Sequence, residues 1–123
     1  MVTGSVNAAL EANVRFSIQD RGGHFQEVEA TVDTGYTRFL TLPIARITAL
    51  GLRYLFDDLA VTGDGRVIQL AVYAATVVWD GQSRTIEVQG SDIFPLVGMS
   101  MMLGYLLRIN VLVGGAVEIE ELP

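Results

Sequence analysis

The pattern of apolar and polar residues predicts β-strands over most of the chain. Residues 13–19 carry an apolar side chain at every second position, namely Val14, Phe16 and Ile18. A period of two is typical of a strand with one buried face. A turn cluster follows at residues 20–23, and residues 25–32 alternate again. The two stretches are therefore expected to form a hairpin.

A short helix is expected after the next strand. Residues 39–42 are a brief apolar run, Pro43 suits the first turn of a helix, and Gly51 suits its end. The apolar positions between them are Ile44, Ile47 and Leu50. This spacing predicts a helix of about two turns with one buried stripe.

Two Asp-Gly pairs divide the middle of the chain into hairpins. Asp64-Gly65 lies between two apolar arms, and Asp80-Gly81 follows the long apolar run 67–79. Asp-Gly between apolar runs is a strong hairpin signal. After the second pair, residues 85–89 alternate and place two side chains on the inner face: Ile86 and Val88.

The C-terminal part is predicted to hold strands and a second helix. Residues 94–98 form an apolar run that ends at a glycine, and Ser100 is a suitable cap for a helix over residues 101–107. Residues 109–113 and 117–119 alternate again, with a Gly-Gly turn between them. The elements together predict a mostly β, barrel-like domain with one or two short helices.

Composition limits the chemistry available to this protein. Its 123 residues are enough for one domain with its own core, which we expect to span 1–123. The chain has no cysteine, all eight basic residues are arginine, and His24 is the single histidine. Thiol and Schiff-base chemistry are therefore excluded. No metal or cofactor is expected, because protein zinc sites are usually built from His and Cys.

Charge and hydropathy indicate the surroundings of the protein. The formal net charge is −6, whereas nucleic-acid binding requires a basic surface, so no nucleic-acid partner is expected. Residues 1–13 lack the basic cluster and apolar run of a signal peptide. Residues 93–113 are long enough to span a membrane, but Pro, Gly, Arg and Asn interrupt them. The sequence thus predicts a cytoplasmic protein without a membrane partner.

Asp33 is the most informative candidate for chemistry. It follows an apolar strand directly and opens the turn Asp33-Thr34-Gly35, in which glycine allows the backbone to bend. A carboxylate beside a buried strand costs free energy unless it is paired, hydrogen-bonded or protonated. Catalysis is one reason to accept this cost. The alternative is a turn aspartate that caps its own loop, the commonest role of Asp next to Gly.

The order of elements around this turn resembles the retropepsin-like aspartic peptidases of clan AA. In that order a strand, Asp-Thr-Gly, a second strand, a helix, a Gly-tipped hairpin and the motif Leu96-Val97-Gly98 succeed one another. The runs 32–43 and 95–99 are especially similar to the small bacterial and archaeal branch of the clan. The resemblance covers about residues 10–121. It implies a single-lobed, closed β-barrel that acts as a homodimer.

The resemblance implies roles for individual residues. Asp33 would be the catalytic aspartate, the Thr34 hydroxyl would tie two active-site loops together, and Gly35 would lie beside the substrate. Peptide would also contact the strand after Gly35, a flap formed by the hairpin tip, and the apolar-apolar-glycine motif. These substrate-binding positions are Tyr36, Thr37, Thr62, Gly63, Asp64, Gly65, Leu96, Val97 and Gly98.

The implied activity is that of an aspartic endopeptidase. This chemistry needs two carboxyls and the chain carries one Asp-Thr-Gly, so each subunit of a homodimer would contribute one Asp33. Tyr36 departs from the small residue usual after Asp-Thr-Gly and could narrow the pocket. An alternative function is therefore a catalytically silent dimeric β-barrel that binds peptide or a protein partner.

Overall fold

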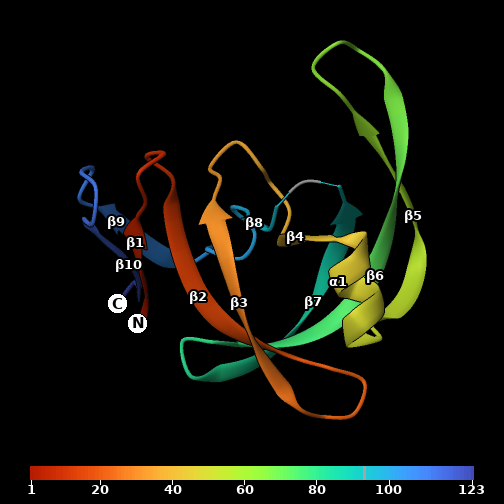
Figure 1. Cartoon of the computed structure of the whole chain (residues 1–123), viewed down its shortest axis with the longest axis horizontal. Helices are drawn as coiled ribbons and strands as arrows, with labels where there is room; N and C mark the ends of the chain where they lie inside the picture. The colour runs from red at the N-terminus through yellow and green to blue at the C-terminus, as the bar shows by residue number, and fades with distance from the viewer. Residues whose placement is uncertain (93) are drawn as a thin grey trace.

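The computed structural model of the chain describes residues 1–92 and 94–123. Within them it contains ten strands and one short helix (Figure 1). The elements in chain order are β1 (Val2–Val6), β2 (Ala12–Gln19), β3 (Phe25–Val32), β4 (Leu40–Pro43), α1 (Ile44–Leu50), β5 (Arg53–Val61), β6 (Val67–Trp79), β7 (Gln82–Ser91), β8 (Leu96–Val97), β9 (Tyr105–Ile109) and β10 (Ala116–Glu121). A mostly β fold with a short helix is thereby confirmed.

All ten strands belong to one sheet. Their order is β5-β6-β7-β4-β8-β3-β2-β1-β10-β9, and β6 also pairs with β2 through two residue pairs. The β3–β8 and β4–β7 pairings are parallel and the others are antiparallel. The β6–β2 pairing shows that the sheet curls around its core, with β5 and β9 as the edge strands. Full closure of a barrel stays a prediction.

The predicted alternation places the core as expected. Side chains from β2, β3, β7 and β10 pack in one hydrophobic cluster together with Trp79 of β6 and Met101. Val14 and Ile18 of β2 are fully buried, and Phe16 between them packs edge-on against Trp79 with ring centroids 5.5 Å apart. The two-residue period of the sequence thus selects the buried face of each central strand.

The two Asp-Gly hairpins form where the sequence predicted them. At the second one, Asp80 and Gly81 have φ angles of 54° and 74°. Positive φ at both positions is the geometry of the tight hairpin turn that Asp-Gly favours. The first hairpin joins β5 to β6 with Val61 opposite Val67. Figure 1 shows it projecting beyond the body, at the end where the loop after β3 lies.

Helix α1 ends at the predicted glycine, but fewer of its apolar side chains are buried than predicted. Gly51 adopts a left-handed φ of 69°, and its N–H donates to the carbonyls of Ile47 and Thr48. Pro43 is the last residue of β4, one position before the helix. Ile47 and Leu50 are buried, whereas Ile44 is 42% exposed. The buried stripe is therefore shorter than the sequence suggested.

The predicted helix over residues 101–107 is wrong. The chain turns at residues 99–104 and then forms β9, whose Leu107 pairs with Ile119 of β10. Gly104, at a φ of 87°, interrupts any helix at this point. The Ser100 hydroxyl donates to the Thr37 carbonyl at 2.5 Å and caps no helix. Strand pairing of an alternating segment thus prevails over the local helix signal.

Other boundaries near the ends of the chain also differ from the predictions. The strand predicted over 109–113 ends at Ile109, and Val111 and Val113 are exposed. Strand β1 was not predicted, although it joins β2 to β10 in the sheet. Of the candidate membrane stretch 93–113, Ile93 lies outside the described residues. In the part of the chain that the structure describes, α1 is the one helix, and it is too short to cross a membrane.

Candidate functional site

The Asp33 turn begins where β3 ends. The Asp33 N–H donates to the Val97 carbonyl at 2.9 Å, and its own carbonyl accepts the Tyr36 N–H at 3.1 Å. The Gly35 N–H donates to Asp33 Oδ1 at 2.9 Å, so one carboxylate oxygen is held by the turn. Asp33 is half-buried, whereas Thr34 and Gly35 are exposed. The three predicted catalytic residues therefore form one hydrogen-bonded turn with an accessible face.

The predicted Leu96-Val97-Gly98 motif passes directly beneath this turn. Val97 is fully buried and pairs with Val32 on one side and Leu40 on the other. The Gly98 N–H donates to the Phe39 carbonyl at 3.0 Å. Because β8 joins the strands on both sides of the turn, it fixes the separation of the two arms that carry the turn.

Gly98 allows the segment after β8 to lie very close to the loop that follows Asp33. A Cβ atom on this residue would lie 2.1 Å from the Arg38 carbonyl oxygen and 2.6 Å from Tyr36 Cδ2. Real Cβ atoms essentially never come so close to backbone, so the position requires glycine. This steric requirement explains why the Leu96-Val97-Gly98 motif ends in glycine.

Tyr36 and Thr37 belong to the same loop as Asp33. The Tyr36 ring packs on Gly98, and its hydroxyl donates to Gln89 Oε1 of β7 at 2.6 Å. Burial raises the pKa of the Tyr36 phenol. The Thr37 side chain is exposed. The large residue after Asp-Thr-Gly is therefore engaged with the sheet through both its ring and its hydroxyl.

The predicted hairpin tip closes on itself. The Thr62 N–H donates to the Arg66 carbonyl at 2.8 Å, and Gly65 has a φ of 83°. Asp64 accepts hydrogen bonds from the Thr62 hydroxyl and, at 2.7 Å, from Arg66 Nε. Across residues 1–92 and 94–123, no hydrogen bond or ion pair joins residues 62–66 to the Asp33 turn. The hairpin exists as predicted, and its action as a flap stays a prediction.

A cleft of about 360 Å³ opens beside the turn. Asp33 and Thr34 line it together with apolar residues from the end of β1, the β1–β2 loop, the end of β9 and the segment after it: Val6, Leu10, Ile109 and Val111. Leu10 and Val111 are 63% and 74% exposed. Glu11 and Thr31 also line the cleft, so the Asp33 carboxyl lies next to a mixed surface that includes these exposed apolar side chains.

Two solved structures resemble the fold of this chain. The solution structure of Simian Foamy Virus (mac) protease matches with a TM-score of 0.52 and 23% identity over 72% of this chain and 91% of that one. The crystal structure of a retropepsin-like aspartic protease from Rickettsia conorii matches with a TM-score of 0.52 and 19% identity over 98% of this chain and 94% of that one. The fold is retropepsin-like. No family model matches the sequence, and no curated protein matches it significantly.

The sequence did not reveal every residue that contacts the loop after Asp33. Gln89 ends an alternating stretch, yet it is only 7% exposed and contacts both Tyr36 and Asp58. The acidic pair Asp57-Asp58 is typical of a solvated face, but Asp58 accepts a hydrogen bond from Arg38 at 2.9 Å. No local signal distinguishes these residues, because their partners are 20 to 53 positions away in the chain.

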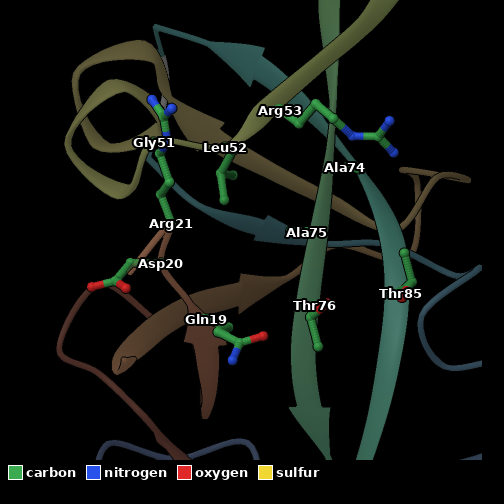
Figure 2. A pocket seen from close by; sticks show the side chains of 10 residues that line it. All are labelled: Gln19, Asp20, Arg21, Gly51, Leu52, Arg53, Ala74, Ala75, Thr76 and Thr85. Carbon is green, nitrogen blue, oxygen red and sulfur yellow. The ribbon is translucent and has the colours of Figure 1, made fainter. Parts of the chain in front are cut away.

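A second cavity, of about 330 Å³, lies at the other end of the β2–β3 hairpin (Figure 2). Figure 2 shows the guanidinium groups of Arg21 and Arg53 pointing away from each other, with Asp20 directed to another side. The remaining lining is largely small or apolar residues, including Gly51, Leu52, Ala74 and Ala75. Because its charged side chains point in different directions, this cavity is not a second candidate catalytic site.

Proposed function

We propose that this protein is an aspartic endopeptidase that works as a homodimer. The observation that carries the proposal is the Asp33 turn, which is fixed by β8 within a fold shared with two aspartic proteases. Asp33 supplies one carboxyl per chain, and a two-fold axis beside the turn supplies the second.

The chemistry follows from placing two carboxyls in contact. Two negative charges in contact repel each other, so in the active pair one carboxyl carries a proton and the other is ionised. The ionised carboxylate takes a proton from a bound water, whose oxygen attacks the peptide carbonyl carbon. The protonated carboxyl donates its proton to the carbonyl oxygen. Thr34 ties the two copies of the turn together, and Gly35 leaves room for the substrate backbone.

Peptide lies extended across the two turns in this proposal. Residues 36–37 and the partly exposed Leu96 border the scissile bond from below, the buried Val97 and Gly98 support the turn from beneath, and the β5–β6 hairpin closes over the peptide as a flap. The flap carries exposed apolar side chains near its tip: Leu59, Val61 and Val67. These side chains suit an extended peptide with apolar residues.

The exposed apolar side chains of the cleft beside Asp33 support dimerisation. An exposed apolar surface next to an incomplete site is what a second copy would cover. Leu10 and Val111 would then be buried at the axis, next to Thr34.

The direct test is cleavage of an unstructured protein substrate by wild type and by Asp33→Asn. The variant removes the acid–base group and keeps the shape and the acceptor for the Gly35 N–H. We expect the cleavage rate to fall at least about a thousandfold, with an unchanged unfolding curve and unchanged dimer mass. Equal cleavage by both proteins would contradict the proposal. A wild type that binds peptide without cleaving it would favour the silent binding barrel instead.

A further inference from the structure

Tyr36 begins a chain of hydrogen bonds that leaves the Asp33 turn. Its backbone belongs to the turn, since its N–H donates to the Asp33 carbonyl and its carbonyl accepts the Met99 N–H at 2.8 Å. Its hydroxyl reaches Gln89 Oε1 in β7 at 2.6 Å. One residue thus joins the turn to a strand in the middle of the sheet.

Gln89 carries the chain of contacts onward to the flap hairpin. It pairs in the sheet with Thr41 of β4 and Val72 of β6, and its side chain is almost fully buried. Its Nε2 atom donates to Asp58 Oδ2 at 3.4 Å. Asp58 lies in β5, three residues before the strand ends at the hairpin tip.

Asp58 receives a second contact from the Asp33 loop. Arg38 Nη2 donates to the same Oδ2 atom at 2.9 Å, while Oδ1 accepts the Leu59 N–H at 2.9 Å. The loop after Asp33 therefore holds strand β5 at one carboxylate by two routes. One route is the Arg38 ion pair, and the other passes through Tyr36 and Gln89.

The two routes differ in strength. The Arg38–Asp58 pair is largely exposed, with side-chain exposures of 53% and 24%, and such pairs contribute little. The Tyr36–Gln89 hydrogen bond is part-buried, and an unpaired polar group there costs more than an exposed one. Burial raises the pKa of the Tyr36 phenol, so the hydroxyl remains a donor throughout the neutral range. The second link of this route, from Gln89 Nε2 to Asp58 Oδ2, is long at 3.4 Å, so the route acts in parallel with the 2.9 Å Arg38–Asp58 pair.

We propose that Tyr36, Gln89 and Asp58 are positioning residues that couple the base of the β5–β6 hairpin to the Asp33 turn. Moving the hairpin would pull on Asp58, and through Gln89 and Tyr36 it would shift the loop that holds Asp33. The catalytic meaning of this coupling rests on the proposed function. The mechanical coupling itself can be tested without any activity.

The test is amide hydrogen exchange on the substrate-free protein. Tyr36→Phe keeps the ring over Gly98 and removes only the hydroxyl. Gln89→Leu replaces the amide that joins Tyr36 to Asp58 with an apolar side chain of similar volume. Each is expected to speed exchange in residues 56–61 about fivefold to tenfold, the effect of losing one buried hydrogen bond. Exchange in β9 and β10 should stay unchanged. By reciprocity, Asp58→Leu should speed exchange at the Tyr36 and Met99 amides.

A matched control is Gln26→Leu. It removes a glutamine–aspartate contact of 3.2 Å between Gln26 and Asp20 in the other hairpin, and it should leave residues 56–61 unaffected. Unchanged exchange in residues 56–61 of Tyr36→Phe and Gln89→Leu would overturn the coupling. A uniform rise along the whole chain would also overturn it, because it would indicate general destabilisation.

Peptide cleavage provides a second, separate readout. If the wild type cleaves, Tyr36→Phe and Gln89→Leu should each lower kcat/KM about fivefold to tenfold, and the double variant should lose little more, since both changes break the same link. If the losses in kcat/KM of the two single variants add up in the double variant, the proposed coupling through Tyr36 and Gln89 is wrong. A wild type without cleavage would refute the proposed function and leave the exchange result to decide the coupling.

Discussion

At the scale of single residues, the site depends on contacts that leave no room for a further atom. Gly98 is buried beneath the Asp33 loop, and its neighbours there are the carbonyls of Tyr36 and Arg38. Backbone atoms cannot move aside as the end of a long side chain can. The loop and the β8 segment must therefore separate if any side chain is introduced.

Gly98→Ala is expected to destabilise the fold by about 3 kcal/mol, because the added methyl overlaps backbone that is fixed on both sides. Urea unfolding at neutral pH measures this change. Gly63→Ala in the exposed hairpin tip is the matched control, since a Cβ added there would have no atom within 4 Å. It should change stability by less than about 0.5 kcal/mol. Equal stability of both variants would contradict the close approach at Gly98.

At the scale of elements, the tip of the β5–β6 hairpin is a turn organised by one carboxylate. Asp64 accepts hydrogen bonds from the Thr62 hydroxyl, the Arg66 N–H and Arg66 Nε. The Thr62 hydroxyl, followed by the Arg66 N–H, lowers the pKa of Asp64 below its ordinary value of 3.8. The tip is therefore ordered by contacts that require the ionised form.

This arrangement predicts a pH-dependent tip. Because the folded pKa of Asp64 is depressed, its stabilising effect is complete above the ordinary value of 3.8 and is lost as pH falls through the lowered pKa. The Arg66 amide signal in NMR spectra should shift and its exchange should quicken over this acidic window. Asp64→Asn keeps an acceptor but does not titrate, so its Arg66 signal should stay constant. An identical titration in both proteins would contradict the role of Asp64.

The strands that carry the site could be predicted from sequence because their signals are local. Alternation in β2 and β3, the Asp-Gly pair at residues 80–81 and the glycine after α1 each specify a structure within a few residues. The Asp-Thr-Gly turn and the Leu96-Val97-Gly98 motif likewise identified two segments that the fold brings together.

The elements that could not be predicted depend on distant partners. β1 has little periodicity of its own and is a strand because β2 and β10 pair with both its edges. β9 has a helix-compatible composition, yet pairing with β10 fixes it as a strand. The polar side chain of Gln89 is buried because Tyr36 and Asp58 satisfy it across the sheet. In each case the deciding contact is remote in sequence.

At the scale of the whole molecule, one chain presents one candidate carboxyl and an apolar surface beside it. We expect a second copy to cover Leu10 and Val111, so Val111→Asp should bury a charge at the axis. The dimer dissociation constant should rise at least about tenfold, and cleavage should fall in parallel. Sedimentation velocity measures the first quantity.

Leu103→Asp is the matched control for this prediction. Leu103 is 83% exposed, precedes β9 and does not line the Asp33 cleft, whereas Val111 follows β9 and lines it. It should leave both dimerisation and cleavage unchanged. If Val111→Asp dimerises as the wild type does, the two-fold axis of the dimer does not lie beside Leu10 and Val111.

The shared active site is tested most directly by mixing wild type with Asp33→Asn at constant total concentration and allowing subunits to exchange. If each site needs one intact Asp33 from both copies, an equal mixture contains active wild-type pairs as about one quarter of all dimers, and cleavage falls to about one quarter of the unmixed rate. A protein whose subunits act alone would retain about one half. A result of one quarter supports the account, and a result of one half contradicts it.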